Sequence, residues 1–243
     1  MTCALTDEQM LTIWERGLPL GPTERALLVI SIADSQVQVD EASAWPLGKR
    51  DARLLELREA TFGETMRCCA SCPRCRADVE FDVAIGRLRQ STAPDNLALS
   101  AQLDGLRVRA RFPTSEDMRA VERLAPDQVE ACLWDRCIVV SDSDGLPVPT
   151  TSLDVAQRAR IETLLDEADP LLDLCFDLAC TECGLGWLAP SDIARATWSE
   201  VARCAQGVLA QVDTLARSYG WPEREILSLS RRRREMYLAM LEH

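Results

Sequence analysis

The chain has 243 residues, enough to bury a substantial core in one large domain or in two smaller ones. Its apolar content of 47% indicates a globular rather than a disordered protein, and no apolar run approaches the ~18 residues that a membrane-spanning helix needs. The net charge of −12 repels the phosphates of nucleic acids, so it argues against generic binding of DNA or RNA.

The N-terminal segment, residues 1–63, is predicted to be helical. Thr6 and Gln9 form a capping-box pattern that predicts the start of a short helix. Pro22 suits the first turn of a second helix, and Gly63 ends a third. We expect helices over residues 6–16, from residue 22 onward and over about 49–61, with a loop or irregular strand over 34–46. This segment is expected to pack against the cysteine-bearing strands or against a partner.

Two C-x-x-C pairs lie far apart in the chain and are its most informative feature. They are Cys72 with Cys75, and Cys180 with Cys183. Apolar and polar residues alternate over 79–83, after the first pair, and over 172–178, before the second. A period of two predicts half-buried strands, so we expect a strand beside each pair.

We interpret Cys72, Cys75, Cys180 and Cys183 as the ligands of one structural Zn²⁺ ion. A thiolate pair at this spacing fits one edge of a tetrahedral site, and two pairs complete it. The fold would then be a zinc ribbon split by a long insertion. Disulfides and free buried thiols are the alternatives. The odd count of 11 cysteines, and an N-terminus without signal-peptide features, indicate the reducing cytoplasm, where zinc is favoured.

Neighbouring residues leave the ligand set open. Cys69 and Cys72 also form a C-x-x-C, and Cys68 lies beside them. Gly184 follows the second pair, where the turn often needs a positive φ that glycine adopts freely. Arg76 holds the matching place after the first pair, so we expect some backbone strain there. Its charge would offset the negative charge that four thiolates leave around one Zn²⁺.

The insertion between the pairs is predicted to contain a β-hairpin and helices. Asp104-Gly105 separates strand-like runs over 97–103 and 106–112, which is a strong hairpin pattern. We expect three helices: one from Ser115 to about residue 124, one that begins at Pro126, and one from Ser152 to about residue 167. A polar loop is expected over 141–151. The spacing of Cys132 and Cys137 matches no zinc knuckle, so both are predicted to be core thiols.

Two charged segments stand out. Residues 162–182 carry seven carboxylates and no Lys or Arg, which we interpret as a solvated face; a docking surface for a basic partner is the alternative. Four arginines, Arg231–Arg234, open the last predicted helix, where positive charge opposes the helix dipole. We interpret them as a solvated or intramolecularly paired run, for which the acidic segment is one partner to consider. A protein-docking patch is the next alternative, and nucleic-acid binding comes last.

The C-terminal segment, residues 191–243, is predicted to be helical. Apolar residues recur every three to four positions from Asp192 to Tyr219, which predicts one long helix, and Gly220 suits its end. Pro222 and Ser230 are expected to begin two short helices. The aromatic residues Trp221 and Tyr237 are predicted to pack in the core beneath them, with an interface role as the alternative.

The residue inventory argues against an enzyme. His243 is the only histidine, which removes the usual Ser-His-Asp and Cys-His catalytic arrangements. A zinc ion held by four cysteines also lacks the open position that catalytic zinc keeps for water. The chain contains neither a P-loop nor a G-x-G-x-x-G motif.

Several short runs carry a resemblance to a known family. They are Asp192-Ile193-Ala194, Trp198, Leu215 to Trp221, Glu225-Ile226-Leu227, Ser230 to Arg233 and Tyr237-Leu238. With the two C-x-x-C pairs and the leucine-rich helix before the first, they resemble a zinc-knuckle family encoded in contractile phage-tail and phage-tail-like injection-system clusters. Its members look similar to the baseplate hub assembly proteins of T-even phages. The resemblance is most specific around the knuckles and from Asp192 onward, and Arg76 departs from the glycine common there.

The resemblance implies an assembly factor (chaperone) or a minor structural component of the baseplate or hub, without enzyme activity. Its expected partners are baseplate, hub or tape-measure proteins; no membrane is expected, and the net charge disfavours nucleic acid. A nucleic-acid-binding zinc-ribbon regulator is the alternative, and binding that weakens steeply with salt would favour it.

The expected fold class is α+β. We predict a split four-cysteine zinc ribbon with a β-hairpin insertion, surrounded by helices and ending in a long helix plus a short helical hairpin. The expected segments are residues 1–63, 64–190 and 191–243.

Overall fold

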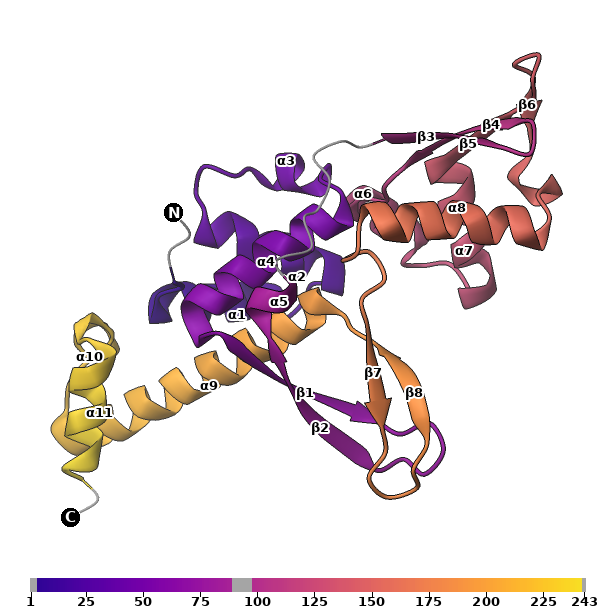
Figure 1. The fold of residues 1–243 in the computed structure, drawn as a ribbon. Coiled ribbons are helices and arrows are strands. Elements are labelled where there is room, and N and C mark those ends of the chain that lie inside the picture. Colours follow the sequence, from indigo (N-terminus) through magenta and orange to yellow (C-terminus); the bar gives the residue numbers. More distant parts are fainter. Residues whose placement is uncertain (1–3, 89–97, 242–243) are drawn as a thin grey trace.

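The computed structural model describes residues 4–88 and 98–241 (Figure 1). These residues form the α+β fold that the sequence predicts, with eleven α-helices and three small antiparallel sheets among them. None of the helices in the described ranges is both long enough and apolar enough to cross a membrane. His243 and Leu97 lie outside the described residues.

A helical body joins the start of the chain to its last third. It consists of α1 (Asp7–Gly17), α2 (Pro22–Ala33), α3 (Val39–Ser43), α4 (Leu47–Phe62) and the long helix α9 (Ile193–Tyr219). Helices α1, α2 and α4 pack against α9, and their apolar faces, which include Ile13, Leu27 and Leu54, form the largest core. Thr6 and Gln9 make the predicted capping box. The predicted loop over 34–46 instead contains the short helix α3.

A glycine allows α1 to approach α9 closely. A Cβ atom built on Gly17 would lie 2.3 Å from Cζ3 of Trp198, so no side chain fits there without movement. The guanidinium of Arg25, in α2, lies over the Trp198 ring, 4.4 Å from its centroid. The Trp198 side chain is therefore enclosed by α1 and α2.

A buried arginine joins α4 to α9 and to the strand that follows α4. Arg58 is 3% exposed and donates two hydrogen bonds of 2.8 Å to the carboxylate of Glu200, in α9. It also donates to the backbone carbonyls of Gly63 and Thr65. One side chain thus fixes the direction in which the chain leaves the helical body.

Two β-hairpins project from this body (Figure 1). The first pairs β1 (Thr65–Ser71) with β2 (Asp78–Ala84), and the second pairs β7 (Cys175–Ala179) with β8 (Gly186–Pro190). The sequence predicts β2 and β7 but not β1 or β8. Strand β7 begins at Cys175 rather than at residue 172, because a turn closed by the Leu172 N–H and the Asp169 carbonyl precedes it.

The insertion between the hairpins has a core of its own. Its elements are β3 (Ala98–Leu103), β4 (Leu106–Arg111), α6 (Ser115–Val121), α7 (Pro126–Cys137), β5 (Ile138–Ser141), β6 (Pro147–Val148) and α8 (Val155–Ala168); the single turn α5 (Ile85–Leu88) precedes them. The sheet order is β3-β4-β5-β6, and side chains such as Val108, Trp134 and Ile161 form its core with α7 and α8.

The insertion confirms some predictions and corrects others. The hairpin at Asp104-Gly105 is confirmed, with positive φ at both residues. The predicted loop over 141–151 is wrong in part, because β6 pairs with β5 there. The helix caps are Thr114 and Asp154 rather than Ser115 and Ser152, since their side chains make the capping boxes. Cys137 is a buried core thiol, as predicted, and Cys132 is half-buried.

The C-terminal arm is the far half of α9 with two short helices folded against it (Figure 1). These are α10 (Glu223–Ser228) and α11 (Arg231–Ala239), and Gly220, with a φ of 69°, ends α9 as predicted. Trp221 stacks on Tyr219 at 4.7 Å between centroids and meets Tyr237 edge-on at 4.9 Å. The aromatic residues therefore pack together, as predicted.

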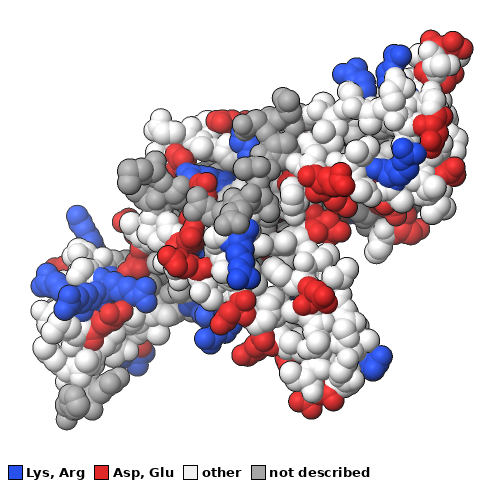
Figure 2. Space-filling view, viewed as in Figure 1, with Lys and Arg blue, Asp and Glu red and all other residues white. Residues whose placement is uncertain are grey.

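The arginine run divides into one buried and three exposed residues. Arg234 is 1% exposed and donates to the Asp7 carboxylate, to Gln211 and to the Leu229 carbonyl. The idea that the run pairs with residues 162–182 is therefore wrong for Arg234, because its partner lies on α1. Figure 2 shows Lys and Arg side chains gathered over α10 and α11, and acidic side chains over the end of α8 nearest the body.

Candidate metal centre

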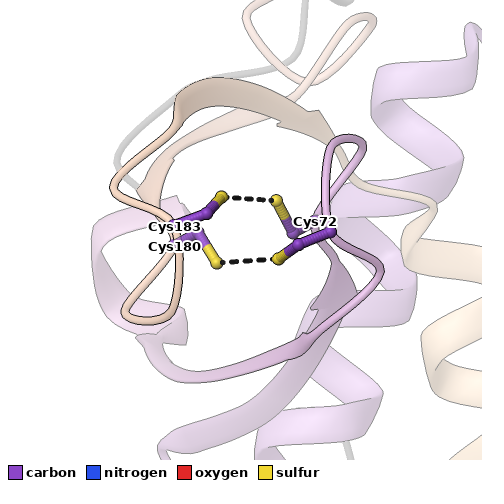
Figure 3. Close-up of side chains that lie close together, drawn as sticks. Cys72, Cys180 and Cys183 are labelled. Atoms are coloured by element: carbon purple, nitrogen blue, oxygen red, sulfur yellow. Dashed lines mark hydrogen bonds between the residues drawn. The ribbon is translucent and has the colours of Figure 1, made fainter.

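Each C-x-x-C pair forms the turn of one projecting hairpin. Cys72 and Cys75 lie between β1 and β2, and Cys180 and Cys183 lie between β7 and β8. The two turns face one another, so that the four side chains point into one space (Figure 3). The structure thus brings together the four cysteines that the sequence singles out.

The sulfur geometry fits a tetrahedral ion. The Sγ atoms of Cys72 and Cys183 are 3.6 Å apart, as are those of Cys75 and Cys180, and all four lie within 4.8 Å of one another. Four thiolates at the ordinary Zn–S distance of about 2.3 Å have sulfurs ~3.8 Å apart. A disulfide requires about 2.05 Å, so these pairings are not disulfides.

The two turns repeat the same backbone hydrogen bonds. The Arg76 N–H donates to the Cys72 carbonyl, and the Gly184 N–H donates to the Cys180 carbonyl, both at 2.9 Å. The Cys72 N–H donates to Ala77 and the Cys180 N–H donates to Leu185 in the matching way. Both halves of the centre are therefore built alike, although they come from distant parts of the chain.

The expected backbone strain at Arg76 is confirmed. Its φ is +63°, close to the +70° of Gly184 at the matching position. A left-handed backbone is unfavourable for a residue with a Cβ atom, and such strain persists only where the surroundings impose it. The first turn thus adopts the geometry of the second even without a glycine.

An aromatic contact supports the arrangement away from the sulfurs. Phe81 in β2 and Phe176 in β7 meet edge-on, with ring centroids 5.2 Å apart. Both rings pack against the large core of the helical body. The hairpins are consequently held together at their bases by apolar contact and at their tips by the cysteine cluster. The alternation of apolar and polar residues predicted that both phenylalanines lie in strands, but it did not predict that their rings are in contact.

The thiols differ in acidity. The Cys75 and Arg74 N–H groups stabilise the Cys72 thiolate and lower the pKa of Cys72 to about 6, although desolvation opposes this. The Ala77 N–H favours the Cys75 thiolate, but desolvation and the sulfurs of Cys180, Cys183 and Cys72 outweigh it and raise the pKa of Cys75 to about 12. Four adjacent thiolates therefore need a cation, and metal binding must release protons.

The other cysteines of the described ranges do not join the cluster. Cys68 is half-buried against Phe81 on the paired strand, and Cys69 is exposed on the opposite face of β1. Within the described residues, the only metal-compatible cysteine group consists of Cys72, Cys75, Cys180 and Cys183. Four cysteine ligands would leave a zinc ion without a position for water, so the chemistry that this group supports is structural.

One family matches the chain. The family described as T4 bacteriophage base plate protein matches residues 20–185, which is more than half of the chain and includes both cysteine pairs. The match ends before Asp192, so the C-terminal runs that suggested the resemblance lie outside it. No curated protein and no solved structure gives a match. The chain belongs to the T4 bacteriophage base plate protein family.

Proposed function

We propose that the protein is an assembly factor, or a minor structural component, of the baseplate or hub of a contractile phage tail-like injection system. It acts in the cytoplasm by binding other proteins and catalyses no reaction. The observation that carries this proposal is the family match over residues 20–185. The matched residues contain both cysteine turns, so the family assignment and the candidate metal centre concern the same part of the molecule.

The proposed cofactor is one structural Zn²⁺ ion held by Cys72, Cys75, Cys180 and Cys183. Its support is the separation of the four sulfurs and the matching hydrogen bonds of the two turns. The ion would join the tips of two hairpins that otherwise form separate two-stranded sheets. An isolated two-stranded hairpin is marginally stable in water, so the ion would supply rigidity that neither hairpin has alone.

The proposed partners are baseplate, hub or tape-measure proteins of the same particle. The hairpins extend from the helical body and present an outer surface on which Leu188 is 68% exposed (Figure 1). A rigid projection loses little conformational entropy when it binds, which favours affinity. The nucleic-acid alternative receives no support from the charge, which is −12 for the whole chain.

Deleting the gene from its tail cluster tests the function. Electron microscopy of the deletion strain should show tails without complete baseplates, and the wild-type gene supplied in trans should restore them. A gene carrying Cys75→Ser and Cys183→Ser should fail to restore them, whereas one carrying Cys69→Ser should succeed. Complete, infective or injecting particles made without the protein would contradict the proposal.

Mass spectrometry of purified particles separates the two roles. If the protein is a minor structural component, it should be present at a fixed number of copies per finished particle. An assembly factor should be absent from finished particles yet co-purify with one baseplate or hub protein when the two are expressed together.

A further inference from the structure

An apolar pocket opens on the insertion where it meets the helical body. Its volume is about 320 Å³, and the side chains that line it include Leu133, Trp134, Leu165 and Leu172. Arg111 and Glu162 also line it, and the Arg111 guanidinium is already bound to Asp117. The pocket therefore offers apolar surface to a side chain from outside, and its one acidic lining residue, Glu162, has no ion-pair partner among the described residues.

Further acidic residues adjoin the pocket lining: Asp166 lies one helical turn beyond Glu162 on α8, and Asp173 directly follows the lining residue Leu172. Glu162, Asp166 and Asp173 are exposed, and none of them forms an ion pair with any residue in the described part of the chain. Partial desolvation and the nearby negative charge of Asp173 raise the pKa of Asp166. A basic partner would offset this negative charge.

The complementary surface lies on α11. Arg232, Met236 and Met240 follow one another at intervals of four residues, so they share one face of the helix, and Arg233 lies beside them. Met236 and Met240 are 56% and 60% exposed. Neither Arg232 nor Arg233 pairs with a carboxylate of another described residue. Flexible methionine side chains suit irregular apolar pockets, and the arginines suit the acidic residues beside this one.

These two surfaces lie apart: the pocket is where the insertion meets the helical body, and α11 is at the end of the C-terminal arm. Figure 1 shows α8 running from the body into the insertion, with α11 at the end of the C-terminal arm on the other side of the body. No described residue of the arm lines the pocket of its own chain. We propose that α11 of one chain docks into the pocket beside α8 of a second copy, so that the protein associates head to tail.

The geometry has two consequences. In a head-to-tail contact each docked chain leaves one half of the contact free, so further chains can add in a ring or an open row. The acidic residues beside the pocket are exposed, so the attraction is screened within about 10 Å at 0.1 M salt. Association should therefore be stronger at low than at high ionic strength. This inference does not depend on the proposed role at the baseplate.

Light scattering of the purified, reduced, zinc-supplemented full chain tests the proposal. At low salt the wild-type mass should rise with concentration above the 27.0 kDa of one chain, and it should fall back as salt is added. A pocket variant, Glu162→Lys with Asp166→Lys, and a helix variant, Met236→Ser with Met240→Ser, should each remain at the mass of one chain. Circular dichroism shows whether each variant is folded.

Mixing the two variants gives the sharper result. The pocket variant keeps an intact α11 and the helix variant keeps an intact pocket, so the mixture should form particles of two chains and no more. Glu15→Lys with Glu41→Lys matches the charge change elsewhere, and Leu146→Ser with Leu188→Ser matches the loss of exposed apolar surface. Both controls should associate like the wild type. The proposal would be overturned by a wild-type chain that stays monomeric or by a mixture of the two variants that does not associate. If such a monomer bound an isolated basic peptide, the pocket would be assigned to a different protein partner.

Discussion

Single side chains decide whether the two hairpins can share a metal ion. Changing Cys75 or Cys183 to Ser replaces a thiolate by a hydroxyl that remains protonated and binds zinc poorly. We expect either variant to lose the one zinc ion per chain that native mass spectrometry should find in the wild type. Structural zinc binding is coupled to folding, so the backbone amides of the hairpins should also lose protection from hydrogen exchange.

Cys69→Ser is the matched control for these substitutions. Cys69 lies three residues before Cys72 in β1 but is exposed and outside the cluster. Its replacement should leave one zinc ion bound. Loss of zinc from this variant alone would show that Cys69, rather than Cys72 or Cys75, completes the site.

Two glycines provide a matched test of close packing. Gly17→Ala places a methyl group against Trp198, and overpacking of this kind costs about 1–3 kcal/mol. Gly207→Ala, in the middle of α9, meets nothing within 4 Å and should gain about 0.5–1 kcal/mol, because alanine is the better helix former. Urea unfolding should show shifts of opposite sign. Equal effects would mean that Trp198 does not pack against α1 in solution.

At the residue scale the sequence predicts the cysteine cluster better than it predicts buried charges. The cysteine spacing identified all four members of the cluster, and the position of Arg76 predicted its strained backbone. The burial of Arg58 and Arg234 was not predicted, because both depend on partners from distant helices: Glu200 for one and Asp7 for the other. Nothing local in the chain marks such pairs.

At the scale of elements, the Arg58–Glu200 pair holds α4, β1 and α9 together. Arg58→Met would leave the largely buried Glu200 carboxylate with only Arg203, at 3.8 Å, and would remove the donor to two carbonyl groups. Breaking a buried pair in this way costs about 3–5 kcal/mol. The double variant Arg58→Met with Glu200→Leu should recover part of this loss in urea unfolding. A double variant no more stable than Arg58→Met would contradict a direct interaction.

A second buried carboxylate organises the insertion. Asp117 caps α6 through the Thr114 N–H and accepts hydrogen bonds from Arg111 and Arg136. Burial alone would raise its pKa, but these donors outweigh burial and hold the pKa of Asp117 well below its usual range. The unfolded chain therefore binds this proton more readily, and the stabilisation is present above about pH 4 and lost as the pH falls below it.

Asp117→Asn removes this titration. The difference in free energy of unfolding between the wild type and the variant should be largest near neutral pH and should shrink as the pH falls below about 4. Taking the difference cancels the other carboxylates, which titrate in both proteins. A difference that stays constant with pH would show that Asp117 does not titrate between the folded and unfolded states as inferred.

Elements with strong local patterns were predictable, and those that depend on pairing were not. Asp104-Gly105 and the capping box at Thr6 specify their structures within a few residues. Strand β1 contains Cys68-Cys69 and lacks a clear alternation of apolar and polar residues, and β6 is only two residues long. Both strands form mainly because they pair with a neighbouring strand, β2 or β5. The same holds for β8, which pairs with β7 across the second cysteine turn.

On the scale of the whole molecule, the candidate metal centre closes a loop around the insertion. The chain leaves the body through the first hairpin, forms the insertion with its separate core, and returns through the second hairpin. The cysteine cluster and the Phe81–Phe176 contact join the two passages. Loss of the metal should therefore loosen the hairpins first and leave the insertion intact.

Hydrogen exchange with and without a chelator tests this order of stability. Removing the metal should increase exchange in β1, β2, β7 and β8, while the insertion core around Val108 and Ile161 keeps its protection. Each kcal/mol lost should lower the melting temperature by about 2–4 °C for a chain of this size. Acid should act like the chelator, because protons compete with the metal for the thiolates. The Cys75→Ser variant should show rapid hydrogen exchange in the hairpins without any treatment, and neither chelator nor acid should increase it further. Equal protection of the hairpins in the wild type and in this variant would mean that packing against the helical body, rather than a metal ion, stabilises them.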